Sequence, residues 1–128
     1  MSDNPLLPLA EFPDFAAIRP EHAAPAVEAM IAEAERRVAA LERRCEPTWD
    51  GRVAALHDAT APLWRAWGVV EHLLSVANCD AWREVEKSLQ PAIIAFSMRI
   101  MQSRPLYDAL AALQASPSFA TLDAGRRR

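Results

Sequence analysis

The chain has 128 residues, of which 52% are hydrophobic and 24% are charged, and its formal net charge is −3. These values are typical of one globular domain rather than a disordered chain. The small negative charge argues against nucleic acid or an anionic membrane surface as a partner. Only three glycines occur, and because glycine is a poorer helix former than alanine by about 1 kcal/mol per residue, the composition favours helix.

Two further features bear on where the protein works. The N-terminal residues lack the basic and apolar regions of a signal peptide, and no run approaches the ~18 apolar residues of a membrane-spanning helix. The two cysteines, Cys45 and Cys79, lie far apart and form no Cys-x-x-Cys pair, which indicates free thiols in a reducing compartment. We therefore expect a cytoplasmic protein without a membrane partner.

Residues 1–19 combine prolines with large apolar side chains. Proline blocks regular helix and biases the residues before it toward extended conformations. We predict an extended arm that lies across the helices, with its leucine and phenylalanine side chains in surface grooves. The prolines are Pro5, Pro8 and Pro13, and the apolar residues are Leu6, Leu7, Leu9, Phe12, Phe15 and Ile18.

A first helix is predicted from Pro20, a residue suited to a first helical turn, to about Cys45. Its apolar residues recur at helical spacing, and charged residues occupy the other face, as on a solvated helix. The apolar stripe is Val27, Met30, Ile31, Ala34, Val38 and Leu41. Glu33 and Arg37 are spaced for an ion pair worth only ~0.3 kcal/mol.

The stretch from Trp49 to Ala77 carries the longest apolar seam. Steps of four and three residues keep its members on one helical face. They are Trp49, Val53, Leu56, Thr60, Leu63, Trp67, Val70, Leu74 and Ala77. Thr48 is a suitable N-cap. Because a mid-helix proline removes a backbone hydrogen bond, we expect Pro62 to kink or break the helix, with Asp58 or Thr60 capping the second half.

Two more helices are predicted, one from Asp80 with a kink at Pro91 and one restarting near Ser103. The apolar stripe of the third is Trp82, Val85, Leu89, Ala92, Phe96 and Ile100, with a second edge at Ile93, Met98 and Met101; the fourth carries Leu106, Leu110 and Leu113. The sequence therefore predicts an all-α fold: an antiparallel bundle of about four main helices, two of them proline-kinked, with an extended Pro-rich N-terminal arm. We expect a single domain over residues 1–128, with the arm at 1–19 and the helices at 20–128.

The sequence offers little catalytic or metal-binding chemistry. Its histidines, His22, His57 and His72, belong to no His-Glu-x-x-His or Glu-x-x-His motif. His57 and His72 would lie ~22 Å apart on a straight helix, too far to share a metal ion. We therefore predict no metal-binding or catalytic residue in this chain. The four tryptophans, Trp49, Trp64, Trp67 and Trp82, are more simply interpreted as core residues than as a cofactor site.

A set of short stretches carries a further signal in its order and spacing. The stretches are Asn4-Pro5-Leu6-Leu7, Phe12-Pro13-Asp14-Phe15, Ile18 with Pro20-Glu21-His22, Pro25-Ala26, Thr48-Trp49, Trp67-Gly68-Val69-Val70 with His72-Leu73, Val76 with Asn78, Trp82-Arg83, and Leu106-Tyr107 with Ala109-Leu110. Together they resemble the N-terminal region of the thimet-oligopeptidase family of zinc metallopeptidases, in its oligopeptidase A branch. The resemblance runs from Asn4 to about Arg128, with departures at Leu74, Trp82 and Val85-Glu86.

The resemblance implies the front part of a mostly helical, cytosolic enzyme that cuts short peptides in a deep channel between two lobes. In that family one zinc ion is bound by a His-Glu-x-x-His pair and a downstream glutamate, which lie beyond the region matched here. The implied role is a non-catalytic part of the channel wall, with zinc only in the full-length enzyme and with no catalytic, metal or substrate-binding residue assigned in this chain. The implied partners are the remainder of the peptidase and its short peptide substrates, and we expect an isolated fragment to self-associate through apolar surface.

Two alternatives stay open. The chain can be a free-standing helical interaction or scaffold module from a truncated gene, which the DNA after the codon for Arg128 would distinguish. It can also be a small Cys/His hydrolase that uses Cys45 or Cys79, in which case alkylation of the thiols should abolish activity.

Overall fold

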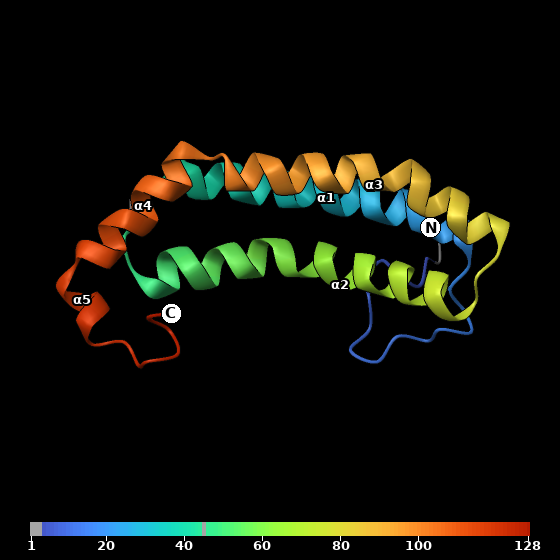
Figure 1. Cartoon of the computed structure of the whole chain (residues 1–128), viewed down its shortest axis with the longest axis horizontal. Coiled ribbons are helices and arrows are strands. Elements are labelled where there is room, and N and C mark those ends of the chain that lie inside the picture. The colour runs from blue at the N-terminus through green and yellow to red at the C-terminus, as the bar shows by residue number, and fades with distance from the viewer. Residues whose placement is uncertain (1–3, 45) are drawn as a thin grey trace.

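The computed structural model describes residues 4–44 and 46–128. Three long helices lie alongside one another (Figure 1): α1 (Pro20–Glu42), α2 (Ala55–Val76) and α3 (Asp80–Met101). Two shorter helices, α4 (Arg104–Ala115) and α5 (Pro117–Ala120), follow at the end of the molecule where α3 ends. In the described part of the chain there is no strand, only one isolated bridge between Leu6 and Leu9. The all-α prediction is confirmed.

The core lies among the three long helices, each of which contacts the other two. Small residues of α1 allow close approach, and larger side chains from α2 and α3 fill the space between them. The buried members include Val27, Ala34 and Val38 of α1, Leu63, Trp67 and Val70 of α2, and Trp82, Leu89, Ile93 and Phe96 of α3. The apolar stripes predicted for these helices thus supply most of the core.

The seam that begins at Trp49 is one uninterrupted helical run. A six-residue π-helix, η1 (Trp49–Ala54), leads directly into α2, and the Thr48 hydroxyl accepts a hydrogen bond from the Gly51 N–H at 3.0 Å. The expected restart at Asp58 or Thr60 is wrong, because α2 continues through Pro62. Pro62 is exposed, so water can satisfy the carbonyl that loses its intrahelical donor.

The N-terminal arm is anchored at both of its ends, but its middle stands out. Leu6 and Ile18 are buried, and the Asn4 Nδ2 donates to the backbone carbonyl of His22 at 2.8 Å. Phe12, which we expected in a surface groove, is 85% exposed. The arm forms a loop beside α2 (Figure 1), and the Phe12 ring faces solvent although the backbone just before it is bonded to α2.

Arg52 is a buried charge that the sequence analysis did not identify. Its side chain, 1% exposed, reaches from η1 to the end of α1, where Nη1 donates to the Leu41 carbonyl at 2.7 Å and Nη2 donates to the Arg44 carbonyl. The last carbonyls of a helix have no intrahelical donor and carry the negative end of the helix dipole. Arg52 therefore supplies both donors and positive charge, and it fixes the connection between α1 and α2.

Candidate functional site

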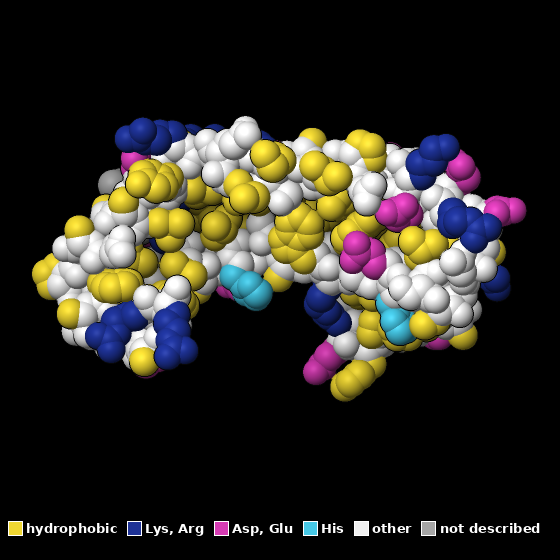
Figure 2. All heavy atoms as spheres, in the orientation of Figure 1, with side chains coloured by type: hydrophobic (Ala, Val, Ile, Leu, Met, Phe, Trp, Pro, Cys, Tyr) yellow, Lys and Arg dark blue, Asp and Glu magenta, His cyan; other side chains and the backbone are white. Residues whose placement is uncertain are grey.

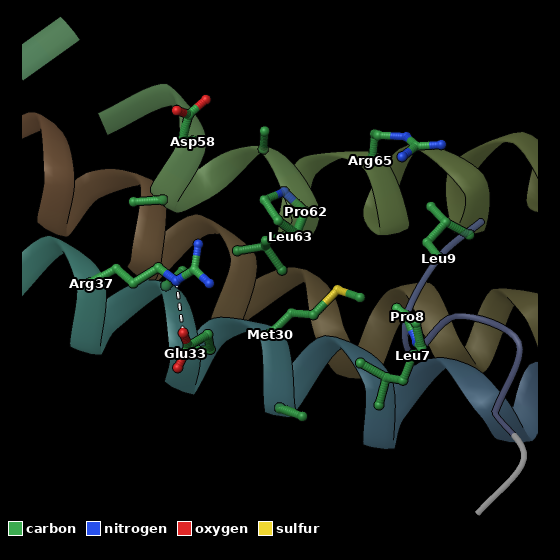
Figure 3. Close-up of a pocket in the computed structure, with 14 residues that line it drawn as sticks. Leu7, Pro8, Leu9, Met30, Glu33, Arg37, Asp58, Pro62, Leu63 and Arg65 are labelled. Carbon is green, nitrogen blue, oxygen red and sulfur yellow. Dashed lines mark hydrogen bonds and ion pairs between the residues drawn. The ribbon is translucent and has the colours of Figure 1, made fainter. Parts of the chain in front are cut away.

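A groove of about 500 Å³ lies between α1 and α2. None of the residues that line it comes from α3, which lies behind it in Figure 3. We call it the α1–α2 groove. Its apolar lining consists of Leu7, Pro8 and Leu9 from the arm, Ala29, Met30 and Ala34 from α1, and Ala59, Ala61, Pro62 and Leu63 from α2. The alanines leave the hollow open, and the arm residues close one end of it (Figure 3).

Four charged residues complete the lining: Glu33, Arg37, Asp58 and Arg65. On α1, Glu33 is held within its own helix. It accepts from Arg36 at 2.9 Å (Nε) and 2.7 Å (Nη2), and from the Arg37 Nε at 2.7 Å. These hydrogen bonds, the Arg36 bonds first, lower the pKa of Glu33 from 4.5 to about 2. One carboxylate thus meets two guanidinium groups, of which only that of Arg37 lines the groove.

The α2 rim is different. Asp58 is exposed and forms no hydrogen bond or ion pair with the residues that the structure describes. Arg65 is occupied, because its Nη2 donates to the backbone carbonyls of Ala10 and Glu11, both at 2.8 Å. Arg65 therefore ties the arm to α2 at the closed end of the groove. Asp58 lies on α2 at the opposite end of the groove, and its carboxylate has no charged partner among the described residues (Figure 3).

A second charged cluster joins α1 to α3 and to the start of α4. Glu42 accepts two hydrogen bonds from Arg99, at 2.7 and 2.9 Å, and one from the Ser103 hydroxyl at 2.5 Å. Arg99 also pairs with Glu35, with 2.9 Å between Nε and Oε2. The Arg99 hydrogen bonds lower the pKa of Glu42, and Glu42 in turn raises the pKa of Arg99. These bonds join α1 to α3 and to the start of α4, so the cluster helps to hold the fold together.

The structure does not bring the three histidines together at a site. His22 is half-buried, and its Nδ1 accepts from the Arg19 N–H at 3.1 Å at the start of α1. His57 is exposed, and His72, also exposed, lies against Phe15 with 5.2 Å between ring centroids. Among residues 4–44 and 46–128, no group of three or more His, Cys, Asp or Glu side chains could hold a metal ion.

The cysteines and tryptophans complete the residues that the sequence singled out. Cys79 is exposed and free, and Cys45 lies outside the described residues. Trp67 and Trp82 are core residues, as predicted, but Trp64 is 37% exposed and Trp49 is only half-buried. The Trp64 ring still contacts Phe96 of α3, at 5.9 Å between centroids.

Exposed apolar side chains gather along one edge of α3. Ile94, Met98 and Met101 are 54, 44 and 77% exposed, and their spacing of four and three places them on one helical face. We call these three residues the α3 apolar edge. Figure 2 shows hydrophobic side chains spread over α3 and the neighbouring part of α2. None of the helices in the described ranges combines the length and the apolarity needed to cross a bilayer.

Comparison with known proteins gives one consistent result. The family model "Neurolysin/Thimet oligopeptidase, N-terminal domain" matches residues 27–128. The Organellar oligopeptidase A, chloroplastic/mitochondrial, of Arabidopsis thaliana is 33% identical over 128 residues, which are all of this chain and 16% of the relative. The Probable cytosolic oligopeptidase A of the same plant is 32% identical over 128 residues, 18% of its length. Oligopeptidase A of Haemophilus influenzae is 33% identical over 125 residues, 98% of this chain and 18% of the relative. The chain thus spans less than one fifth of the length of these relatives.

Proposed function

We propose that this chain, which belongs to the neurolysin/thimet oligopeptidase family as its N-terminal domain, forms part of the substrate-channel wall of a zinc-dependent oligopeptidase and is not itself catalytic. The observation that carries the proposal is the extent of the match. Nearly the whole chain aligns, yet it corresponds to only 16–18% of each relative. The chemistry then belongs to the part of the enzyme that lies outside this chain.

The residues present do not fit a zinc site. A catalytic zinc needs three protein ligands that converge on one point, and no such group occurs in the described part of the chain. In this proposal the zinc ion is held by the remainder of the peptidase, and the helices described here act only by shape and surface. The compartment that we propose is the cytoplasm, which the name of one plant relative states for that protein, whereas the name of the other states the chloroplast and mitochondrion.

The α3 apolar edge supports a partner for this domain. Three large apolar side chains at 44–77% exposure on one helical face are the kind of surface that another part of a protein covers. The remainder of the peptidase is the partner that we propose, and short peptides are the substrates of the complete enzyme. The isolated chain should self-associate through the same edge.

A chimera tests the proposal. This chain would replace the aligned N-terminal segment of the Haemophilus influenzae oligopeptidase A, and hydrolysis of a quenched fluorescent peptide would be measured with and without zinc. We expect the chimera to cleave the peptide and the 128-residue chain alone to be inactive. Zinc-dependent hydrolysis by the chain alone, or a folded chimera without activity, would overturn the proposal.

The second candidate is a free-standing helical interaction module made from a truncated gene. The same α3 apolar edge favours it, because an exposed apolar edge can equally bind a separate protein. The downstream DNA distinguishes the two candidates. A reading frame that continues to a His-Glu-x-x-His motif supports the peptidase, and a stop codon after Arg128 supports the module.

A further inference from the structure

Gly68 lies in the middle of α2, at a place where the described chain does not require a glycine. It is exposed, and a Cβ added to it would meet no atom of another part of the described chain within 4 Å. A glycine inside a helix destabilises the helix relative to alanine, and it is used where another backbone approaches closely. A partner that packs against α2 at this point would give Gly68 a structural role.

The residues around Gly68 continue the α3 apolar edge onto α2. Trp64, Gly68 and Glu71 are spaced four and three residues apart and therefore share one face of α2. The Trp64 ring is 37% exposed although it contacts Phe96, so this face of α2 lies beside α3. We call the α3 apolar edge together with Trp64 and Gly68 the α2–α3 face. Figure 2 shows hydrophobic side chains that extend from α3 onto the neighbouring part of α2.

One end of the α2–α3 face is acidic. Residues 71–87, where the chain turns from α2 into α3, carry four carboxylates and two cationic side chains. Both cations are already paired on α3, and the pairs are Arg83–Asp80 and Lys87–Glu84. Glu71 is exposed and has no charged partner among the described residues, and Glu86 accepts only from the Gln90 amide, at 3.0 Å. Two carboxylates near the turn are therefore open to cations of a partner.

We propose that the α2–α3 face binds an amphipathic helix that belongs to the remainder of the peptidase. The apolar side chains of this helix pack on Trp64 and on the α3 apolar edge, and its backbone comes closest at Gly68. Its lysine or arginine side chains lie at one end, where they pair with Glu71 and Glu86.

The choice of this occupant rests on the proposed function. The chain matches only 16–18% of each relative, so most of the length of such a peptidase is available to provide the helix. A helix suits the face, because its apolar stripe can lie on α3 while its backbone approaches a position without a side chain on α2. Charge selects a basic helix over an acidic one.

Thiol labelling of Met98→Cys measures whether the face is covered. The variant is made in the 128-residue chain, at a concentration at which sedimentation shows a monomer, and in the chimera with the Haemophilus influenzae oligopeptidase A. We expect labelling by a maleimide, followed by mass spectrometry, to be at least about tenfold slower in the chimera. Ala32→Cys, at an exposed position of α1, is the matched control and should react equally fast in both proteins.

Equal labelling rates of Met98→Cys in the chain and in the chimera would overturn the inference. The readout does not depend on hydrolysis of a peptide. A chimera that cleaves peptides while Met98→Cys stays reactive would therefore contradict the docked helix and leave the proposed function intact. An inactive chimera in which Met98→Cys is protected would support the docked helix and contradict the proposed function.

A substitution at Gly68 should have opposite effects in the two proteins. In the isolated chain, Gly68→Leu should raise the thermal midpoint by roughly 2–5 °C, because leucine is a better helix former and its side chain enters open space. In the chimera, the same change should speed the labelling of Met98→Cys at least about fivefold, because the added side chain displaces the docked helix. An unchanged labelling rate in the chimera would overturn the close approach at Gly68.

A charge reversal tests the basic end of the proposed helix. In the chimera, Glu71→Lys should speed the labelling of Met98→Cys about two- to fivefold, because an exposed ion pair is replaced by repulsion between like charges. Glu28→Lys, at an exposed position of α1, makes the same change in charge away from the face and should leave the rate unchanged. Equal effects of the two variants, or slower labelling with Glu71→Lys, would overturn the pairing with lysine or arginine.

Discussion

Helix α1 uses its glutamates differently on its two sides. Toward α3, Glu42 is bonded to Arg99 and Ser103, residues that lie 57 and 61 positions away. Toward α2, Glu33 is bonded to Arg36 and Arg37 of the same helix. A carboxylate that is bonded to an arginine of another helix links the two helices. A carboxylate that is bonded to an arginine three or four residues along its own helix forms no such link. On the α1 side of the α1–α2 groove, the Glu33 carboxylate is therefore satisfied within its own helix and forms no bridge to α2.

Both interfaces depend on one shared core, and its loss should have the largest effect. Trp67 is 7% exposed in the middle of α2. Trp67→Ala should therefore lower the free energy of unfolding by roughly 3–5 kcal/mol, since truncation of a buried aromatic removes transfer energy and leaves a cavity. Urea denaturation followed by circular dichroism measures this. Trp64→Ala, at 37% exposure, should cost clearly less.

A loss below about 1 kcal/mol for Trp67→Ala would contradict the placement of this side chain in the core. It would instead indicate that the three helices do not share one cooperative unit. The comparison between the two sides of α1 would then lose its basis, because each interface would unfold independently.

The cross-helix cluster should contribute the next largest effect. Arg99→Met leaves Glu42 and Glu35 without their partner on α3, and we expect a loss of about 1–2 kcal/mol, because a carboxylate that is 19% exposed then lacks its charged donors. Arg36→Met removes a pair that lies within one helix and is largely exposed, and should cost clearly less, because solvent screens an exposed pair. Urea midpoints of the two variants compare them directly. Equal losses of unfolding free energy would mean that the ion pair between two helices stabilises the fold no more than the pair within one helix.

The sequence predicted this fold well wherever periodicity alone decides the outcome. The start of α1 at Pro20 and the buried stripes follow from local spacing and capping. Of the kink or break expected at Pro62, the break is wrong. The cost of a proline inside a helix depends on whether water reaches the carbonyl that loses its donor, which local sequence does not record. Arg52 was missed for a similar reason. A single arginine in an apolar seam gives no sign that it will meet the end of another helix.

The α1–α2 groove could not be predicted from the sequence, because its existence depends on how far apart two helices pack. It needs α1 and α2 packed at alanines and the arm residues Leu7 and Leu9 folded back over one end. The Glu33–Arg37 pair on its rim was predicted from spacing, because both residues belong to one helix. Its companion on the opposite rim, Asp58, was expected to cap a helix and carried no sign of facing a cavity. Local pairs can be read from the sequence, and the spaces between helices cannot.

The smallest expected effect is on the pH dependence of stability. Hydrogen bonds from Arg99 lower the pKa of Glu42 below its usual 4.5. The ionised form is therefore favoured by folding, so the stabilisation is fully present above about pH 4.5 and is lost as the pH falls through the lower folded-state pKa. Glu42→Gln should flatten the fall in unfolding free energy as the pH drops below about 4.5.

The matched variant is Glu33→Gln, which separates a cross-helix carboxylate from a local one. Glu33 also has a lowered pKa, about 2, through Arg36 and Arg37, but its pairs are exposed to solvent and hold no second helix. We expect Glu33→Gln to flatten the profile less than Glu42→Gln does, since solvent screens exposed pairs. Urea titrations at several pH values in low salt measure both slopes. A larger change in Glu33→Gln would show that local pairs, and not the bridge to α3, determine the acid sensitivity of the domain.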